Sequence, residues 1–401
     1  MSSPTGAALH VLTLTPFYPS RRDERGGFVS EPLGELEGLG VRSSVLAVRP
    51  LYKGNVLQSE IAPRATWVRY PAWPGNAGLA SAGALLSWRL RRRVRALHNQ
   101  IPIDILHAHA PLPCGEAARR LGRELGIPVV VTVHGLDAYF REQVAGAAGE
   151  RCAALCQRVY EASATVVCIS EQVRRQVLAG SPGLRGTDVV YNGVDPVRFC
   201  PAEHPPAGEP VVASIGSLIA IKGHDVTLRA VAELKSEFPS LRVRIVGEGV
   251  EQGRLEALAR ELGVAGRVEF LGRRTRAEVA EVLRGSHIFV LPSRYEGLGV
   301  AYLEAMACGL PVIAYRGQGI EEMIRHNENG ILMVEQTAEN ASRGLAAVLR
   351  TLLQHQEMRE TMGLAARRAV VQAYTLRQQA LELLRVFDGV RRAVLAGRST
   401  E

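Results

Sequence analysis

The 401-residue sequence lacks any apolar run of the roughly 18 residues that a membrane-spanning helix needs. Its start, MSSPTGAALHVLTLTP, has no basic segment ahead of a short apolar run, so it resembles a first strand rather than a signal peptide. We therefore expect a cytoplasmic protein. The patterns G-x-x-x-x-G-K-[ST] and G-x-S-x-G are also missing, so no motif indicates a P-loop nucleotidase or a serine hydrolase.

Metal-binding patterns are scarce as well. None of the six cysteines forms a C-x-x-C pair. Cys152 and Cys156 stand four apart, the spacing of one helix face, which favours packing of reduced thiols over chemistry. His107 and His109 would share one face of a strand, but no third ligand accompanies them, so we expect no metal site.

The composition, with 47% apolar and 22% charged residues, is typical of a globular chain of two or three domains. The formal net charge is +8. A basic excess fits contact with nucleic acid, anionic lipid or phosphorylated small molecules, and also an ordinary solvated basic surface.

Short runs rich in Val and Ile alternate with longer amphipathic stretches along the chain. Runs without polar alternation are typical of strands buried on both faces of a parallel sheet. Together with the helical stretches between them, they predict a doubly wound α/β fold. The expected strands are HVLTLT, VRSSVLAV, DILHAHA, PVVVTVHG, ATVVCIS and DVVYNGV in the first half, and PVVASIGSL, LRVRIVGEG, RVEFLG, HIFVLPS, PVIAY and GILM in the second.

The alternation breaks once, at residues 195–210, where five prolines and no apolar period predict a linker. With about six strands on each side, we expect two Rossmann-like domains, residues 1–200 and 201–375, facing an interdomain cleft. In open α/β sheets ligands bind at the carboxyl ends of the strands. The cleft between the domains is therefore the expected substrate site.

The stretch SRYEGLGVAYLEAMACGLP, residues 293–311, predicts a strand, a glycine turn and a helix. Gly297 and Gly299 allow a ligand to approach the backbone closely. The helix that follows directs its free N–H groups at the same place, which suits a diphosphate. Gly309 is expected to end this helix in a left-handed conformation.

Glu296 and Glu304 flank this anion site. Because carboxylates repel phosphate, we expect them to accept hydrogen bonds from neutral hydroxyls of a sugar or a ribose. The alternative is structural: an acidic residue near a helix N-terminus and a helical glutamate with its bonds satisfied inside the protein.

The segment EGLGVAYLEAMACGLPVIA resembles the E-x7-E signature of glycosyltransferase family 4, the retaining enzymes of GT-B fold, and the resemblance covers nearly the whole chain. Within the family the sequence is most similar to the TuaC-like polysaccharide glycosyltransferases. The resemblance implies that Glu296 binds donor-sugar hydroxyls and Glu304 the ribose. Backbone amides around Gly297, Leu298, Gly299 and Val300 would hold the sugar and diphosphate.

Other motifs resemble the family too. Lys222 in SIGSLIAIKGHD matches the lysine that holds the diphosphate, whereas Ser217 stands where the family often has arginine. His134 in VTVHGLD matches a histidine near the donor sugar, which could bind a hydroxyl or transfer a proton. Gly26 and Gly27 resemble a glycine pair beside the diphosphate and the acceptor. Glu322 occupies a commonly acidic family position, and the last helix, about 376–401, would return to the first domain.

The resemblance implies a hexosyltransferase that moves sugar from a nucleotide diphosphate sugar to a saccharide or lipid-linked saccharide acceptor, in surface polysaccharide or glycolipid synthesis. No Asp-x-Asp motif is present, so we expect no metal and no other cofactor. Two alternatives remain: a GT-B epimerase, which turns over without acceptor, and a non-catalytic binder of nucleotide sugars or polyanions. No nucleic-acid partner is expected.

The segment Ala77–Leu97, AGLASAGALLSWRLRRRVRAL, is apolar first and then strongly basic. It predicts either an interfacial helix with Trp88 at its boundary or an ordinary surface helix with a basic face. In the first case the enzyme would dock peripherally on the anionic inner leaflet of the cell membrane.

Overall fold

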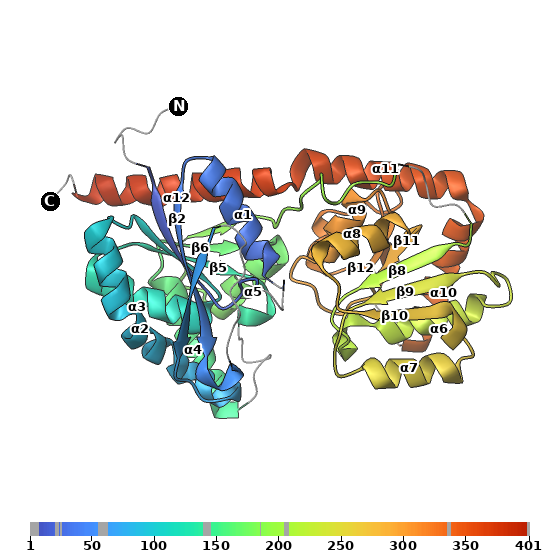
Figure 1. Ribbon diagram of the computed structural model, residues 1–401, viewed down its shortest axis with the longest axis horizontal. Helices are drawn as coiled ribbons and strands as arrows, with labels where there is room; N and C mark the ends of the chain where they lie inside the picture. The colour runs from blue at the N-terminus through green and yellow to red at the C-terminus, as the bar shows by residue number, and fades with distance from the viewer. Residues whose placement is uncertain are drawn as a thin grey trace. The chain divides into compact units, whose positions relative to one another are not determined.

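The computed structural model describes residues 8–20, 24, 26–54, 63–138, 146–184, 186–203, 208–334 and 338–398. The chain forms two compact units, shown in Figure 1. Unit 1 comprises Met1–Asn192 and Leu376–Glu401, and unit 2 comprises Gly193–Thr375. The chain enters unit 2 before the proline-rich segment that was expected to link the domains. The described part of that segment packs on unit 2, where Phe199 is fully buried and its carbonyl accepts a hydrogen bond from Arg367.

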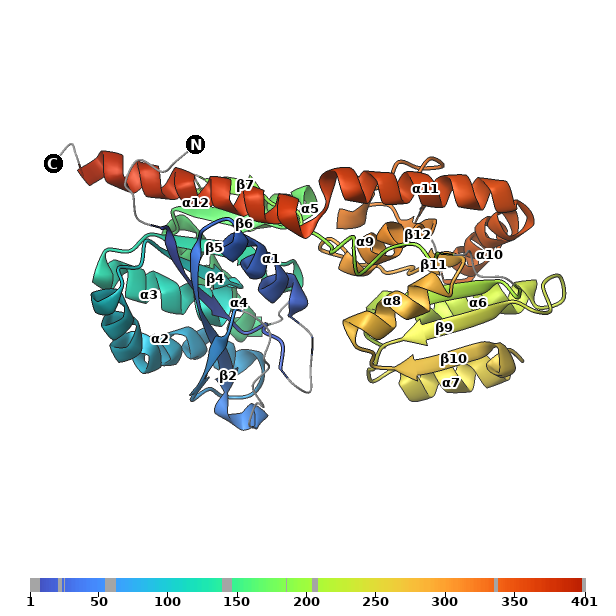
Figure 2. The same ribbon diagram turned by 45° about the horizontal axis from the view of Figure 1, so that its top comes forward.

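Unit 1 is built on a seven-stranded parallel sheet with strand order β3-β2-β1-β4-β5-β6-β7. Its strands are β1 (His10–Thr15), β2 (Arg42–Pro50), β3 (Ala65–Tyr70), β4 (Ile105–His109), β5 (Val129–Val133), β6 (Thr165–Cys168) and β7 (Thr187–Val189). Its helices are α1 (Gly27–Gly38), α2 (Gly75–Gln100), α3 (Glu116–Leu125), α4 (Gly146–Glu161), α5 (Glu171–Gly180) and α12 (Leu376–Arg398). The last helix of the chain, α12, packs against α1, as Figure 2 also shows.

Unit 2 is built on a six-stranded parallel sheet with strand order β10-β9-β8-β11-β12-β13. Its strands are β8 (Val211–Ile215), β9 (Arg242–Val246), β10 (Val268–Gly272), β11 (Ile288–Val290), β12 (Val312–Tyr315) and β13 (Ile331–Met333). Its helices are α6 (His224–Leu234), α7 (Gln252–Glu261), α8 (Arg276–Arg284), α9 (Val300–Ala307), α10 (Ala338–Gln354) and α11 (Gln356–Ala373). Helix α6 packs against α10, and α9 packs against α11.

The predicted α/β fold is confirmed, and each expected run contains a strand. The central strands β1, β4 and β5 are buried along their whole length, which is why their sequences show no polar alternation. Strand β3, in ATWVRY, was missed. It lies at the edge of its sheet and is only partly buried, so its sequence mixes polar and apolar residues.

The direction of strand order reverses at one place in each sheet, between β1 and β4 in unit 1 and between β8 and β11 in unit 2. At such a switch point the loops that leave the two strands diverge and open a crevice at the carboxyl edge. The segments that follow these four strands are therefore the places to look for a ligand site in each unit.

Candidate functional site

In unit 2, Lys222 ends the segment that leaves β8. The chain makes a tight 3-10 turn at Ala220–Lys222 and then enters α6 through Gly223, whose φ of 69° is left-handed. A Cβ at Gly223 would stand 2.1 Å from the carbonyl oxygen of Pro292, just after β11. Glycine at this position thus lets the Lys222 turn lie directly against the exit of the neighbouring strand.

Glu296 lies on the segment that leaves β11, and it meets Lys222. Lys222 Nζ lies 2.7 Å from Glu296 Oε1, and Glu296 is only 8% exposed. The glutamate backbone is held from both sides, because its N–H donates to Gln318 Oε1 at 2.9 Å and its carbonyl accepts from the Gly319 N–H at 3.0 Å. A buried carboxylate in a fixed backbone frame therefore anchors the lysine ammonium.

Gly299 is the N-cap of α9, with a left-handed φ of 85°. A Cβ there would lie 2.7 Å from the Tyr302 ring, so this turn needs glycine. No side chain caps the helix, and Val300 is its first residue, so the first N–H groups of α9 lack the usual side-chain acceptor. At the other end Gly309 has φ 78°, which confirms its expected left-handed conformation.

Glu304 lies on the second turn of α9 and is 6% exposed. Its Oε1 lies 2.8 Å from Arg276 Nη1, at the first position of α8. The Arg276 guanidinium also lies over the Phe199 ring, 5.1 Å from the ring centroid. The two glutamates of the E-x7-E pattern therefore each have a cationic partner, and Arg276 was not identified from the sequence.

In unit 1, Gly26 and Gly27 begin α1 on the segment that follows β1. A Cβ at Gly26, where φ is 111°, would stand 2.8 Å from the Tyr18 backbone nitrogen, so this turn also needs glycine. The next residue, Phe28, packs edge-on against His134, with ring centroids 4.9 Å apart. The structure thus brings the glycine pair and His134 together at one edge of the sheet.

Behind His134 lie the two histidines of β4. His134 Nε2 is 3.0 Å from His109 Nδ1, and the two rings are stacked with centroids 5.2 Å apart. The His107 ring lies 4.4 Å from that of His109, as expected for residues on one face of a strand, and His107 Nε2 is 2.7 Å from Thr132 Oγ1. His107, His109 and His134 therefore form a continuous row of polar rings inside a largely apolar sheet, which we call the histidine file.

Burial keeps this file neutral. Desolvation lowers the pKa of His107 and of His134 to about 3, and it lowers the pKa of His109 as well. Asp137, which accepts the His134 backbone N–H at 2.9 Å, has its pKa raised by burial to about 7. At neutral pH His134 is therefore a neutral imidazole that can donate or accept one hydrogen bond, and it is a poor general acid or base.

Comparison with known proteins identifies the family. Residues 29–198 match the model described as Glycosyltransferase Family 4, and residues 200–369 match the model described as Glycosyl transferases group 1. The chain belongs to the group 1 glycosyltransferases of family 4 type.

Two curated relatives illustrate the likeness of this glycosyltransferase in sequence. The GDP-mannose-dependent alpha-(1-6)-phosphatidylinositol monomannoside mannosyltransferase of Mycolicibacterium smegmatis is 28% identical over 407 residues, which cover 96% of this chain and 99% of the relative. The D-inositol 3-phosphate glycosyltransferase of Rhodococcus erythropolis is 31% identical over 282 residues, which cover 64% of this chain and 62% of the relative.

Solved structures show the GT-B fold of the glycosyltransferase. Sucrose-phosphate synthase from Thermosynechococcus elongatus superposes with a TM-score of 0.80 at 23% identity, covering 96% of this chain and 100% of that one. HepE from Anabaena, in complex with UDP and glucose, gives a TM-score of 0.72 at 18% identity over 95% of this chain and 100% of that one.

The basic segment of the glycosyltransferase forms α2, whose apolar side faces inward. Ala82, Leu86, Leu90 and Val94 repeat every four residues and are buried. The apolar stripe expected to contact lipid is therefore used in the core of unit 1. Among the described residues, no helix combines the length and hydrophobicity needed to span a bilayer.

The outer side of α2 carries charge and one aromatic ring. Trp88 is 71% exposed and lies beside the exposed Arg89, Arg92 and Arg93, which make no ion pair with any other described residue. Arg91 and Arg95 instead share Glu124 of α3. Together with Val68, residues 88–93 line a groove of about 540 Å³.

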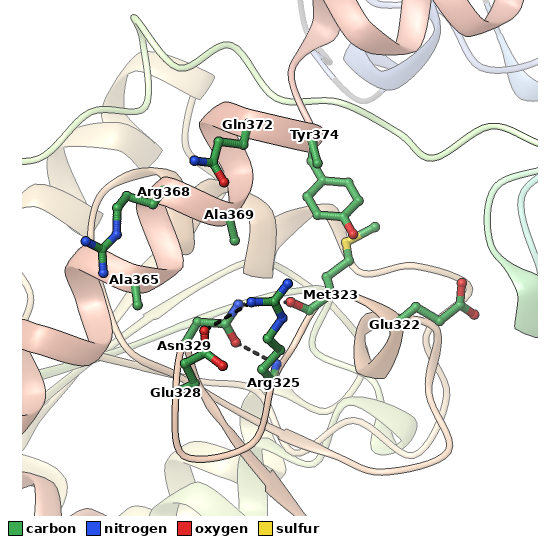
Figure 3. Close-up of a pocket in the computed structure, with 11 residues that line it drawn as sticks. Glu322, Met323, Arg325, Glu328, Asn329, Ala365, Arg368, Ala369, Gln372 and Tyr374 are labelled. Carbon is green, nitrogen blue, oxygen red and sulfur yellow. Dashed lines mark hydrogen bonds and ion pairs between the residues drawn. The ribbon is translucent and has the colours of Figure 1, made fainter.

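Glu322 lies in a separate pocket of about 380 Å³ between the loop around Arg325 and helix α11, shown in Figure 3. In that view Glu322 points away from Arg325 and Asn329. Neither Lys222 nor Glu296 lines this pocket. Within the described part of the chain, no cluster of three or more His, Cys, Asp or Glu side chains could hold a metal ion.

Proposed function

We propose that this glycosyltransferase moves a hexosyl unit from a nucleotide diphosphate sugar to a saccharide or lipid-linked saccharide acceptor. The observation that carries the proposal is the ion pair between Lys222 and the buried Glu296, at the uncapped start of α9. Cation, carboxylate and helix N-terminus together supply partners for both a diphosphate and its sugar.

The donor would lie across this edge of unit 2. Its diphosphate meets Lys222 Nζ and the first backbone N–H groups of α9, where positive charge and the helix dipole act together. Glu296 accepts hydrogen bonds from sugar hydroxyls, and Glu304 accepts those of the ribose. Before the donor binds, Glu296 neutralises the ammonium, so the lysine is held in place without a bound anion.

The reaction breaks the bond between the sugar and the diphosphate, so negative charge develops on the departing phosphate. Lys222 and the α9 N–H groups stabilise that charge in the transition state without a metal ion. The fixed Lys222 ammonium would thus take the place of a bound metal ion in stabilising the leaving group. We propose retention of anomeric configuration, with front-face attack assisted by the leaving diphosphate, on the basis of the family resemblance.

Unit 1 would supply the acceptor side together with Gly26, Gly27 and His134. Because burial lowers the pKa of His134 to about 3, we assign it a hydrogen bond to a sugar hydroxyl rather than a proton transfer. The mycobacterial relative supports a lipid-linked saccharide acceptor, since it is named for a phosphatidylinositol monomannoside. The TuaC-like assignment and the expected cleft stay predictions.

A two-stage experiment tests this function. Thermal unfolding is first measured with UDP-, GDP- and ADP-sugars, because a ligand at 100 times its Kd stabilises the fold by roughly 2.7 kcal/mol. Release of nucleoside diphosphate is then measured with and without candidate acceptors. Acceptor-dependent release is the expected result. Sugar interconversion without acceptor would show an epimerase, binding without turnover would show a binder, and no binding would overturn the proposal.

We also propose that the outer side of α2 docks this enzyme on an anionic membrane surface. Trp88 and the exposed Arg89, Arg92 and Arg93 carry this second proposal. Each arginine near an anionic bilayer contributes about 1 kcal/mol. Because the apolar stripe of α2 is buried, the attraction is mainly electrostatic and should weaken with salt.

Flotation with vesicles of phosphatidylcholine and anionic phosphatidylglycerol tests the docking. The double variant Arg92→Gln/Arg93→Gln should lower the partition coefficient roughly tenfold or more, since it removes two exposed charges that pair with no other described residue. The matched control, Arg91→Gln/Arg95→Gln, removes the same charge from the same helix, but Glu124 already offsets part of it. Equal binding by the wild type and the first variant would refute the proposal.

A further inference from the structure

Arg276 occupies an electrostatically unfavourable place. It is the first residue of α8, where the helix dipole favours anions and opposes cations. The chain nevertheless fixes this start firmly, because Thr275 and Glu278 form a reciprocal capping box. Favourable contacts elsewhere must therefore offset the position of this guanidinium.

Two contacts of the guanidinium serve this purpose. On one side the guanidinium lies over the ring of Phe199, which is fully buried. On the other, Arg276 Nη1 lies 2.8 Å from Glu304 Oε1. Only 24% of the arginine side chain and 7% of the glutamate side chain are exposed, so solvent screens the pair weakly.

The pair constrains the glutamate more than the helix alone would. A glutamate on a helix retains several rotamers, whereas a partner bound at one carboxylate oxygen fixes both the rotamer and the plane of the group. Acceptance of two adjacent ribose hydroxyls requires a carboxylate that is ionised and correctly oriented. The ion pair with Arg276 favours the charged form of Glu304 and fixes one of its two oxygens.

We infer that Arg276 is a positioning residue of the donor site, which holds the Glu304 carboxylate in the orientation that recognises the ribose diol. The inference rests on the proposed function, since it assumes that Glu304 binds the ribose. Arg276 thereby sets the preference of the enzyme for ribonucleotides over deoxyribonucleotides.

The test compares a nucleoside diphosphate with its 2′-deoxy and 3′-deoxy counterparts by calorimetry, using whichever of UDP, GDP or ADP the wild type binds most tightly. The wild type should prefer the ribonucleotide by roughly tenfold or more, as expected for hydrogen bonds to a charged group. In Arg276→Gln this preference should fall several-fold, while the affinity for the deoxy forms changes less than about twofold. Arg276→Lys, which retains the charge, should recover part of the preference.

Two controls separate a positioning role from general damage. Arg274→Gln alters a neighbouring exposed arginine and should leave the preference unchanged. Adding Arg276→Gln to Glu304→Gln should cause no further change, because the arginine acts through the glutamate.

Each outcome decides one assignment. If Arg276→Gln weakens ribose and deoxy forms equally, the arginine contacts the phosphates or maintains the fold, and the inference is wrong. If it changes neither, the inference is also wrong. A wild type that binds nucleotides without preferring ribose would overturn both the inference and the role of Glu304, whereas a wild type that binds none would overturn the proposed function itself.

Discussion

The carboxyl edges of the two sheets carry different kinds of polar group, charged in unit 2 and neutral in unit 1. In unit 2 the residues at this edge are charged and already paired, Lys222 with Glu296 and Arg276 with Glu304. In unit 1 they are histidines that burial keeps neutral. A diphosphate requires fixed positive charge, whereas sugar hydroxyls require neutral donors and acceptors. Under the proposed function, the charged edge of unit 2 would bind the donor, and the neutral edge of unit 1 would offer hydrogen-bond partners to sugar hydroxyls on the acceptor side.

The largest expected effect comes from removing the cation of unit 2. Lys222→Ala should lower acceptor-dependent release of nucleoside diphosphate by about 100- to 1000-fold, the usual loss for one group that stabilises transition-state charge. The matched control is Lys235→Ala, an exposed lysine of the same unit. If both variants retain full turnover, the charged edge does not serve the leaving group.

The second largest effect should be a difference in acid stability between the two units. The pKa of His107 and of His134 is about 3 in the fold and about 6.5 in an unfolded chain, so below pH 6.5 the unfolded chain binds more protons and stability falls. The loss is roughly 2 kcal/mol per histidine between pH 6.5 and pH 5. Asp137, whose pKa burial raises to about 7, works in the opposite direction and offsets one histidine.

Unit 1 carries His10, His107, His109 and His134 with lowered pKa, whereas unit 2 carries only His224 among the described residues. We therefore expect unit 1 to lose at least about 2 kcal/mol more than unit 2 on acidification to pH 5. All three tryptophans lie in unit 1, so their fluorescence in urea reports that unit alone. Fluorescence and circular dichroism midpoints that stay together at pH 5 would contradict this expectation.

The two glutamates of unit 2 should differ in what they recognise. Glu304→Ala should weaken nucleoside diphosphate binding by roughly tenfold or more, because it removes the charged acceptor of the ribose. Glu296→Ala should leave that affinity equal or tighter, since it frees the Lys222 ammonium, yet it should lower transfer. Calorimetry with the nucleotide and turnover with the nucleotide sugar measure the two effects, and identical profiles would refute the division of roles.

The smallest loss of turnover should come from changing a histidine of the histidine file in unit 1. His109→Leu leaves His134 Nε2 without the partner it has at 3.0 Å, so turnover should fall by roughly tenfold while nucleotide affinity stays unchanged. His109→Asn can place an amide near the same position and should recover part of the activity. A loss of nucleotide affinity instead would mean that the file serves the charged end of the donor.

Much of the fold was predictable because parallel strands buried on both faces produce apolar runs that the sequence displays directly. Strand β3 was missed, since an edge strand needs no such run. The glycine turns of the site could also be predicted from the sequence. Gly299 and Gly309 adopt the left-handed conformations that suit glycine, and this requirement depends only on the local backbone.

The partners of the candidate residues were not predictable. Lys222 and Glu296 are 74 positions apart, and Arg276 and Glu304 are 28 apart, so no local spacing connects them. Arg276, which was missed, begins an ordinary helix, RAEVAEVLR. The one signal in the sequence was its positive charge at a helix N-terminus, where the dipole disfavours cations. The strand spacing of His107 and His109 predicted a shared face but not the contact of His109 with His134.

By itself the sequence determined the α/β architecture, the glycine turns and the family, because these depend on local periodicity, backbone freedom and a contiguous motif. The tertiary structure decided which charges meet and which groups remain neutral. Ion pairing requires residues from distant strands to reach one sheet edge, and a lowered histidine pKa requires burial by the whole unit. Both are consequences of the packed fold, and neither is written in any single segment of the chain.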